Sequence, residues 1–120
     1  MIFDDIDTIA NKKIKEAVYQ LLNEVLQIGR HHKISAIITN HLPTNFNWTR
    51  IILNECHVVV YFPSFATNKV TYLLENYVDL EKKEIRNFKR MNTRWVALFK
   101  HAPRIFLSEH EIGFLDQDDE

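Results

Sequence analysis

The apolar run Met1-Ile2-Phe3 ends in two adjacent carboxylates, Asp4 and Asp5, and this junction constrains the fold more than any other feature. It predicts a short strand that delivers both acids to one edge of a sheet. There the first acid can help hold the hydration shell of a Mg²⁺ ion beside phosphate groups, and the second can polarise an attacking water. The alternative is helix capping, because Asp4, Asp5, Asp7 and Thr8 all precede a helical pattern.

The segment after the acids predicts a helix and then a second strand. In residues 11–28 the apolar side chains recur at steps of three and four, which indicates an amphipathic helix. Gly29 then predicts a left-handed stop. Residues 34–39 form a short apolar run rich in β-branched side chains, followed by the polar Asn40. We expect a buried parallel strand with polar groups at its carboxyl end.

Three later segments follow the Asp-Asp strand in a fixed order: residues 29–40, residues 50–54 (Arg-Ile-Ile-Leu-Asn) and the strand-like residues 58–62. This series resembles the viral genome-packaging ATPases of the FtsK/HerA group of P-loop NTPases, the poxvirus and giant-virus type, where the second segment reads Arg-Thr-Ile-x-Leu-Asn. The resemblance covers roughly residues 1–74. It implies a partial RecA-like P-loop NTPase domain of α/β class, with a mostly parallel sheet flanked by helices and a small C-terminal β addition.

The resemblance also implies roles for single residues. Asp4 would contact the Mg²⁺ of Mg-ATP through water, and Asp5 would be the catalytic acid. Asn40 stands where the family usually has Gln, one methylene shorter but with the same amide donor and acceptor. Oligomeric motors complete each site with an arginine from a neighbouring subunit, and Arg30 and Arg50 are the candidates. The alternatives are a cation at a helix end for Arg30 and a surface residue for Arg50.

The family's phosphate-binding loop is missing from the sequence. No G-x-x-x-x-G-K-[ST] pattern occurs in the 120 residues, and Gly29 and Gly113 are the two glycines. We therefore expect the chain alone to bind and hydrolyse ATP poorly. It reads as the C-terminal part of a longer or split ATPase whose N-terminal P-loop segment is a missing partner. Residues 1–78 would form its core and residues 79–120 a basic helix with a β hairpin.

Basic side chains concentrate toward the end of the chain. On a helix predicted for residues 80–91, Lys82, Arg86, Lys89 and Arg90 share one face, and they could follow a DNA phosphate backbone. The alternative is a solvated helix face. We also expect a helix that starts at Ser64 or Thr67. Strands are expected at residues 95–99, 105–107 and 112–115, the first two of them joined as a hairpin.

Composition excludes several classes of protein. No apolar stretch approaches the ~20 residues of a membrane span, and the acidic N-terminus is unlike a secretion signal. A single cysteine, Cys56, excludes an internal disulfide and favours a reducing compartment. The six histidines lack the spacings of a structural zinc site, so we expect no metal except Mg²⁺ carried by ATP.

Three functional hypotheses follow. The first is part of an ATP-driven motor that packages double-stranded viral DNA into capsids. Such a motor acts as a homo-oligomeric ring with DNA and capsid proteins as partners, in the viral factory of the host-cell cytoplasm or in the virion. The second is a degenerate, non-hydrolytic interaction module. The third is an α/β DNA-binding protein that uses the basic segment.

Overall fold

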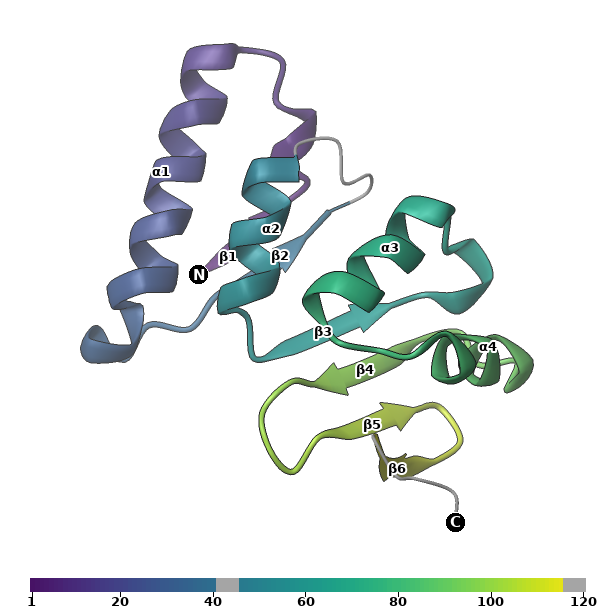
Figure 1. Cartoon of the computed structure of the whole chain (residues 1–120). Helices are drawn as coiled ribbons and strands as arrows, with labels where there is room; N and C mark the ends of the chain where they lie inside the picture. The colour runs from purple at the N-terminus through teal and green to yellow at the C-terminus, as the bar shows by residue number, and fades with distance from the viewer. Residues whose placement is uncertain (41–45, 116–120) are drawn as a thin grey trace. The chain divides into compact units, whose positions relative to one another are not determined.

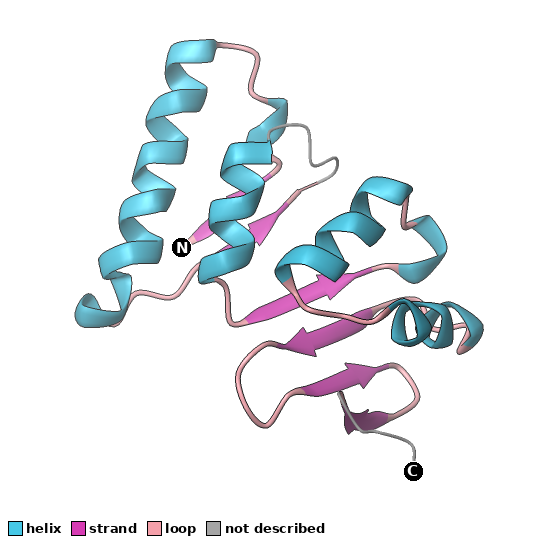
Figure 2. Cartoon of the chain, viewed as in Figure 1, coloured by secondary structure: helices cyan, strands magenta, loops and turns pink. Residues whose placement is uncertain are grey.

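The computed structural model describes residues 1–40 and 46–115, shown by position along the chain in Figure 1 and by secondary structure in Figure 2. The chain divides into two compact units, Met1–Glu55 and Cys56–Glu120. Each unit contains its own sheet and its own hydrophobic core.

Unit 1 is built around two parallel strands. β1 and β2 pair in register, Ile2 with Ile37, Phe3 with Ile38, and Asp4 with Thr39. Parallel neighbours require a crossover connection, which the long helix α1 supplies. The elements in chain order are β1 (Ile2–Asp4), η1 (Ile6–Thr8), α1 (Lys12–Ile28), η2 (Gly29–His32), β2 (Ile37–Thr39) and α2 (Phe46–Glu55).

The helix predicted from residues 11–28 is confirmed as α1. Its N-cap is Asn11, whose side chain accepts hydrogen bonds from the backbone N–H groups of Lys13 at 3.0 Å and Ile14 at 3.1 Å. Its apolar stripe buries Tyr19 and Leu22 in the core of unit 1. The Tyr19 ring stacks on Trp48 of α2 with centroids 4.8 Å apart, so the two helices share one side of the strand pair.

The left-handed stop predicted at Gly29 is wrong. Gly29 has right-handed angles (φ −56°) and leads directly into η2, whereas the left-handed residue is Lys33 (φ 55°). A Cβ on Gly29 would lie 3.0 Å from the carbonyl oxygen of Ile34. The absence of a side chain therefore permits a close approach of two backbone segments.

The second strand of unit 1 is also less buried than predicted. Ile37 is 63% exposed and its registered partner Ile2 is 73% exposed, while Phe3 on the opposite face is buried. A parallel sheet is normally covered on both faces. In unit 1 the helices cover one face of β1 and β2, and the face of Ile2 and Ile37 is open.

Unit 2 is a four-stranded antiparallel sheet with two helices. The strand order is β3-β4-β5-β6. The predicted helix start at Thr67 is confirmed, because its side chain accepts a hydrogen bond from the N–H of Val70, and the predicted hairpin and last strand are confirmed as well. The elements are β3 (Val58–Tyr61), η3 (Pro63–Phe65), α3 (Asn68–Tyr77), α4 (Lys82–Arg90), β4 (Val96–Phe99), β5 (Ile105–Ser108) and β6 (Ile112–Phe114).

The core of unit 2 lies on one face of this sheet. Leu98 is completely buried, and Phe88 of α4 makes edge contacts with the rings of Tyr61 and Phe106, the latter at a centroid distance of 5.0 Å. Gly113 lies opposite Phe106 across the ladder, and a Cβ there would come within 2.6 Å of the ring. Glycine at this position therefore leaves room for the aromatic side chain that closes the core.

The predicted RecA-like, mostly parallel sheet is wrong. β3 pairs antiparallel with β4, Val58 opposite Phe99, and within residues 1–40 and 46–115 the parallel pairing is confined to β1 and β2. A short run of β-branched residues does not reveal the direction of its partner. Pairing with β4 places Val59 beside the fully buried Leu98, so the C-terminal strands join β3 in its own sheet instead of forming a small addition.

Candidate functional site

Four polar residues meet where the two strands of unit 1 end, and we call Asp4, Asp5, Thr39 and Asn40 the strand-edge cluster. The register pairs Asp4 with Thr39, and the Thr39 hydroxyl donates a hydrogen bond to Oδ1 of Asp4. The backbone N–H of Asp5 donates to the carbonyl oxygen and to the hydroxyl of Thr39, at 3.2 Å each. Thr39 thus ties both acids to the end of β2, and Asn40 follows it directly.

The backbone turns sharply at Asp5. This residue adopts left-handed angles (φ 50°, ψ 39°), which aspartate tolerates better than most residues. Its carbonyl oxygen accepts hydrogen bonds from the hydroxyl of Thr8 at 2.7 Å and from the backbone N–H of Thr8 at 3.0 Å. The turn ends the extended backbone of β1 directly after Asp4.

The capping alternative finds little support in this geometry. The N-cap of α1 is Asn11, not one of the acids. Asp5 does precede η1, but its side chain makes no capping hydrogen bond there. Neither acid therefore caps η1 or α1 through its side chain.

The cluster suits the metal side of a nucleotide better than its phosphates. Asp4 is exposed, and the hydroxyl of Thr39 fixes one of its carboxylate oxygens, the ligand type that Mg²⁺ and its bound waters prefer. Among the residues that the structure describes, no three His, Cys, Asp or Glu side chains gather into a metal site. A Mg²⁺ ion here would depend on phosphate oxygens and water for most of its ligands.

Thr39 was missed as a site residue in the sequence, where the neighbouring Asn40 was named instead. The signal was nevertheless present. Two parallel strands of equal length that end in polar residues place those residues side by side, and the third residue of β1 is Asp4 while the third of β2 is Thr39. The prediction for Asn40 stays untested, since Asn40 lies exposed beside residues 41–45, which fall outside the described part.

The two candidate arginines lie in different places in unit 1. Arg30 belongs to η2, which precedes β2, whereas the strand-edge cluster follows it; Figure 1 shows η2 at the end of α1 remote from η1. Arg30 therefore lies at the edge opposite to the acids of its own unit. Arg50 is exposed on α2, one turn after the start of that helix. The roles of the two arginines at a neighbouring subunit stay predictions.

The basic helix predicted near the end of the chain is α4. A capping box closes its N-terminus, with the backbone N–H of Glu81 donating to Oε1 of Glu84 at 3.0 Å. Phe88 anchors its apolar side in the core. The face predicted to contact DNA is exposed along its whole length and carries Lys82, Arg86, Lys89 and Arg90.

The other basic residues of this region have structural contacts. Arg104 donates a hydrogen bond to the carbonyl oxygen of Val78, and Nε of Arg94 lies 3.9 Å from Oε1 of Glu109. Cys56 is half-buried, and burial raises the pKa of its thiol, an effect that the charge of Lys100 partly opposes. A raised thiol pKa lowers the fraction of thiolate, which is the nucleophilic form.

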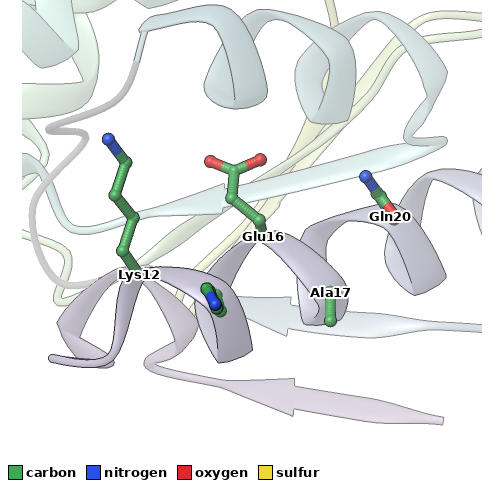
Figure 3. A pocket seen from close by; sticks show the side chains of 5 residues that line it. Lys12, Glu16, Ala17 and Gln20 are labelled. Atoms are coloured by element: carbon green, nitrogen blue, oxygen red, sulfur yellow. The ribbon is translucent and has the colours of Figure 1, made fainter.

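An open hollow of about 510 Å³ lies on the surface of α1 and does not include the strand-edge cluster (Figure 3). All of its lining residues come from one stretch of one helix. A ligand site normally gathers groups from several elements around a concave surface. The hollow therefore reflects the relief of long side chains on a helix, and its lining consists of Lys12, Lys13, Glu16, Ala17 and Gln20.

Comparison with known proteins gives one informative match. The chain is 40% identical over 111 residues to a Sputnik virophage protein named "Uncharacterized protein V3". The match covers 91% of this chain but 45% of the relative, so the chain spans about half of that protein's length. No model of a known protein family matches, and no solved structure matches. The similarity connects the chain to a virophage, and the printed name of the relative states no activity.

Across residues 1–40 and 46–115, no helix combines the length and the apolar character that crossing a bilayer requires.

Proposed function

We propose that this chain is part of an ATP-driven motor that moves double-stranded viral DNA into capsids, and that its strand-edge cluster acts on Mg-ATP. The observation that supports this most is the hydrogen bond from Thr39 to Asp4. It joins the ends of two adjacent parallel strands and holds an exposed carboxylate beside a second acid. Carboxyl ends of parallel strands are where α/β proteins usually bind their ligands.

Each residue of the cluster has a distinct task in this proposal. Asp4 holds water molecules of the metal's hydration shell, and Thr39 fixes the orientation of that carboxylate. Asp5, at the left-handed turn that ends β1, accepts a proton from the attacking water. Asn40 offers an amide to the nucleotide from the end of β2. Bound Mg-ATP supplies the phosphoryl group, and its Mg²⁺ ion neutralises part of the negative charge on the phosphates.

The phosphates require a cradle that this sequence does not encode. A loop of successive glycines normally presents backbone N–H groups to them, and Gly29 and Gly113 lie far apart in the sequence. The proposal therefore includes a phosphate-binding segment from elsewhere, in the same polypeptide or in another chain. More than half of the virophage relative lies outside the match and has room for such a segment.

Assembly completes the proposed site. In a ring of subunits, the exposed guanidinium of Arg50 would reach the nucleotide of a neighbour and stabilise charge on the transferred phosphoryl group. We favour Arg50 over Arg30, which sits at a helix end where a basic side chain already has a sufficient electrostatic role. The ring would act with capsid proteins in the viral factory of the host-cell cytoplasm or in the virion.

A second candidate function rests on α4. Its exposed basic face could bind DNA as the track of the motor, or as the sole activity of an α/β DNA-binding protein. A non-hydrolytic interaction module is the remaining alternative. ATP hydrolysis that depends on the strand-edge cluster would distinguish the motor from a DNA-binding protein and from an interaction module.

The decisive experiment measures ATP turnover in a preparation that also supplies a phosphate-binding loop. Replacing Asp5→Asn keeps the size of the side chain but removes its basicity, and we expect turnover to fall by roughly a hundredfold or more. Asp4→Asn should instead weaken Mg²⁺-dependent nucleotide binding. The matched control is Glu16→Gln on the exposed side of α1, which should leave turnover unchanged. Normal turnover in the Asp5→Asn protein would remove the proposed role.

A further inference from the structure

The sheet of unit 2 is apolar on both faces. Side chains alternate across a strand, so Val59, Leu98 and Phe106 point into the core with α3 and α4. Their neighbours point the other way and define the outer face. One row of this face crosses all four strands in register, Val60 opposite Ala97, Ala97 opposite Leu107, and Leu107 opposite Ile112.

A second row of the outer face is also apolar. Val58 lies opposite Phe99, and Ile105 lies opposite Phe114. No registered position of either row holds a charged or polar side chain, although antiparallel sheets usually alternate apolar and polar residues when one face meets water. The side chains between 37% and 66% exposed on this face are Val58, Val60, Phe62, Leu107, Ile112 and Phe114.

We propose that the outer face binds the outer face of a second copy of this chain, as two sheets packed face to face. Side chains this large and this exposed offer on the order of 100 Å² each, so together they offer roughly 500 Å² or more. A standard interface needs about 800 Å² from each partner. The half-buried Phe99 and Ile105 at the same face bring the total close to this value.

Chemistry favours a second copy over a nucleic acid on this surface. Nucleic acids bind to positively charged surfaces, and in unit 2 the basic side chains that share one exposed helix face belong to α4. The registered positions of the outer face carry no charge, so two identical copies meet without repulsion. An isologous dimer uses the same patch on both subunits.

The row at the centre suggests how the copies fit. A two-fold axis parallel to the strands reverses the strand order, so that β4 of one copy lies over β5 of the other. The small Ala97 side chain then faces the large Leu107 side chain of the second copy, and the same contact repeats on the other side of the axis. Alternation of small and large side chains lets facing sheets interdigitate at their usual spacing of ~10 Å.

The proposal is tested by sedimentation velocity of the purified 120-residue chain between about 1 and 200 µM. We expect a reversible dimer whose population rises with concentration across this range. Ile112→Lys and Val60→Lys, both at exposed positions, should each weaken it by at least tenfold because a desolvated charge has no partner. Ile14→Lys on α1, which is similarly exposed, should change nothing, and circular dichroism should show that all variants are folded.

Three results would overturn the proposal: a monomer at every concentration, a dimer that survives both face variants, or equal weakening by Ile14→Lys. A second measurement tests the axis. In a Cys56→Ser background, a short bis-maleimide should cross-link an Ala97→Cys copy to a Leu107→Cys copy, because facing sheets lie ~10 Å apart, too far for a direct disulfide. No cross-link between the two copies in a dimer would reject this register. Neither experiment involves nucleotide, so the dimer and the proposed ATPase role stand or fall separately.

Discussion

The two units of this chain differ in the size of their sheets and in where their polar side chains gather. Unit 2 closes a four-stranded antiparallel sheet over a core in which Val96 and Leu98 are completely buried. Unit 1 has two strands of three residues each, covered on one face, and ends them in the strand-edge cluster. The difference shows that polar groups are gathered where the sheet is smallest and most open. Sites that bind and release ligands are commonly placed in the less stable parts of a fold.

The largest effect that we expect is a loss of ATP turnover when Arg50 of unit 1 is replaced. In an assembly that hydrolyses ATP, Arg50→Ala should lower turnover by about a thousandfold, the size typical of an arginine supplied by a neighbour. The matched change in unit 2, Arg86→Ala on α4, should weaken DNA binding without altering turnover in the absence of DNA. ATPase assays with and without DNA make the comparison.

Mixing subunits distinguishes a neighbour's site from the subunit's own site. An Arg50→Ala subunit mixed with an Asp5→Asn subunit should recover part of the activity, because some interfaces then join two intact halves. The same mixture with Arg30→Ala tests the other candidate. If neither mixture recovers activity, both arginines are structural residues and the division of chemistry between subunits is wrong.

Two matched core substitutions test the independence of the units. Leu98→Ala should destabilise unit 2 by about 4 kcal/mol, and Leu22→Ala should destabilise unit 1 by about 3 kcal/mol, since both side chains are almost fully buried. Hydrogen exchange read by mass spectrometry should show loss of protection in the unit that carries the change. Equal loss across both units would mean that the chain unfolds as one body, and the comparison would have to be abandoned.

The smallest effect comes from a single hydroxyl in the core of unit 2. In the described residues the Tyr61 hydroxyl is buried without a hydrogen-bond partner, and burial raises the pKa of Tyr61 well above its ordinary value. Tyr61→Phe should therefore increase the unfolding free energy at pH 8 by about 1 kcal/mol. Urea denaturation measures this difference.

The pH dependence of the same variant has a definite sign. Because the folded pKa is raised, the unfolded chain loses this proton first, above about pH 10, and the folded protein loses stability by up to about 1.4 kcal/mol per pH unit there. The Tyr61→Phe protein lacks this loss, so its advantage should grow from pH 8 to pH 11. Tyr72→Phe at an exposed position is the control. A variant that is less stable than the parent at both pH values would contradict the account.

Local patterns in the sequence predicted local elements well. The stripe of α1, the capping residue Thr67 and the hairpin of β4 and β5 all depend on residues close together in the chain. The partner of β3 could not be predicted in this way, because Val58 pairs with Phe99 across two intervening helices and an apolar run does not specify the direction of pairing. The prediction at Gly29 failed for a related reason. Glycine is needed there for its close contact with Ile34 and not for a left-handed backbone angle.

The acids of the candidate site could be predicted from the sequence, but their arrangement in space could not. Asp4 and Asp5 were identified from their position after an apolar run. The role of Thr39 can be recognised only from the register of β1 against β2, which a single sequence does not reveal. The exposed face of Ile2 and Ile37 was likewise hidden, because hydrophobic residues in a short strand predict burial on both sides.

The central claim is that unit 1 meets the nucleotide through a metal ion at the strand-edge cluster, and Mn²⁺ in place of Mg²⁺ tests it directly. With ATP and a phosphate-binding segment present, the paramagnetic ion should broaden the amide NMR signals of Asp4, Asp5, Thr39 and Asn40 more than those of any other described residue of unit 1. Asp4→Asn should abolish the broadening, and the chain without the phosphate-binding segment should show no saturable effect. Broadening centred on any other part of the chain, or none with nucleotide bound, would contradict the claim.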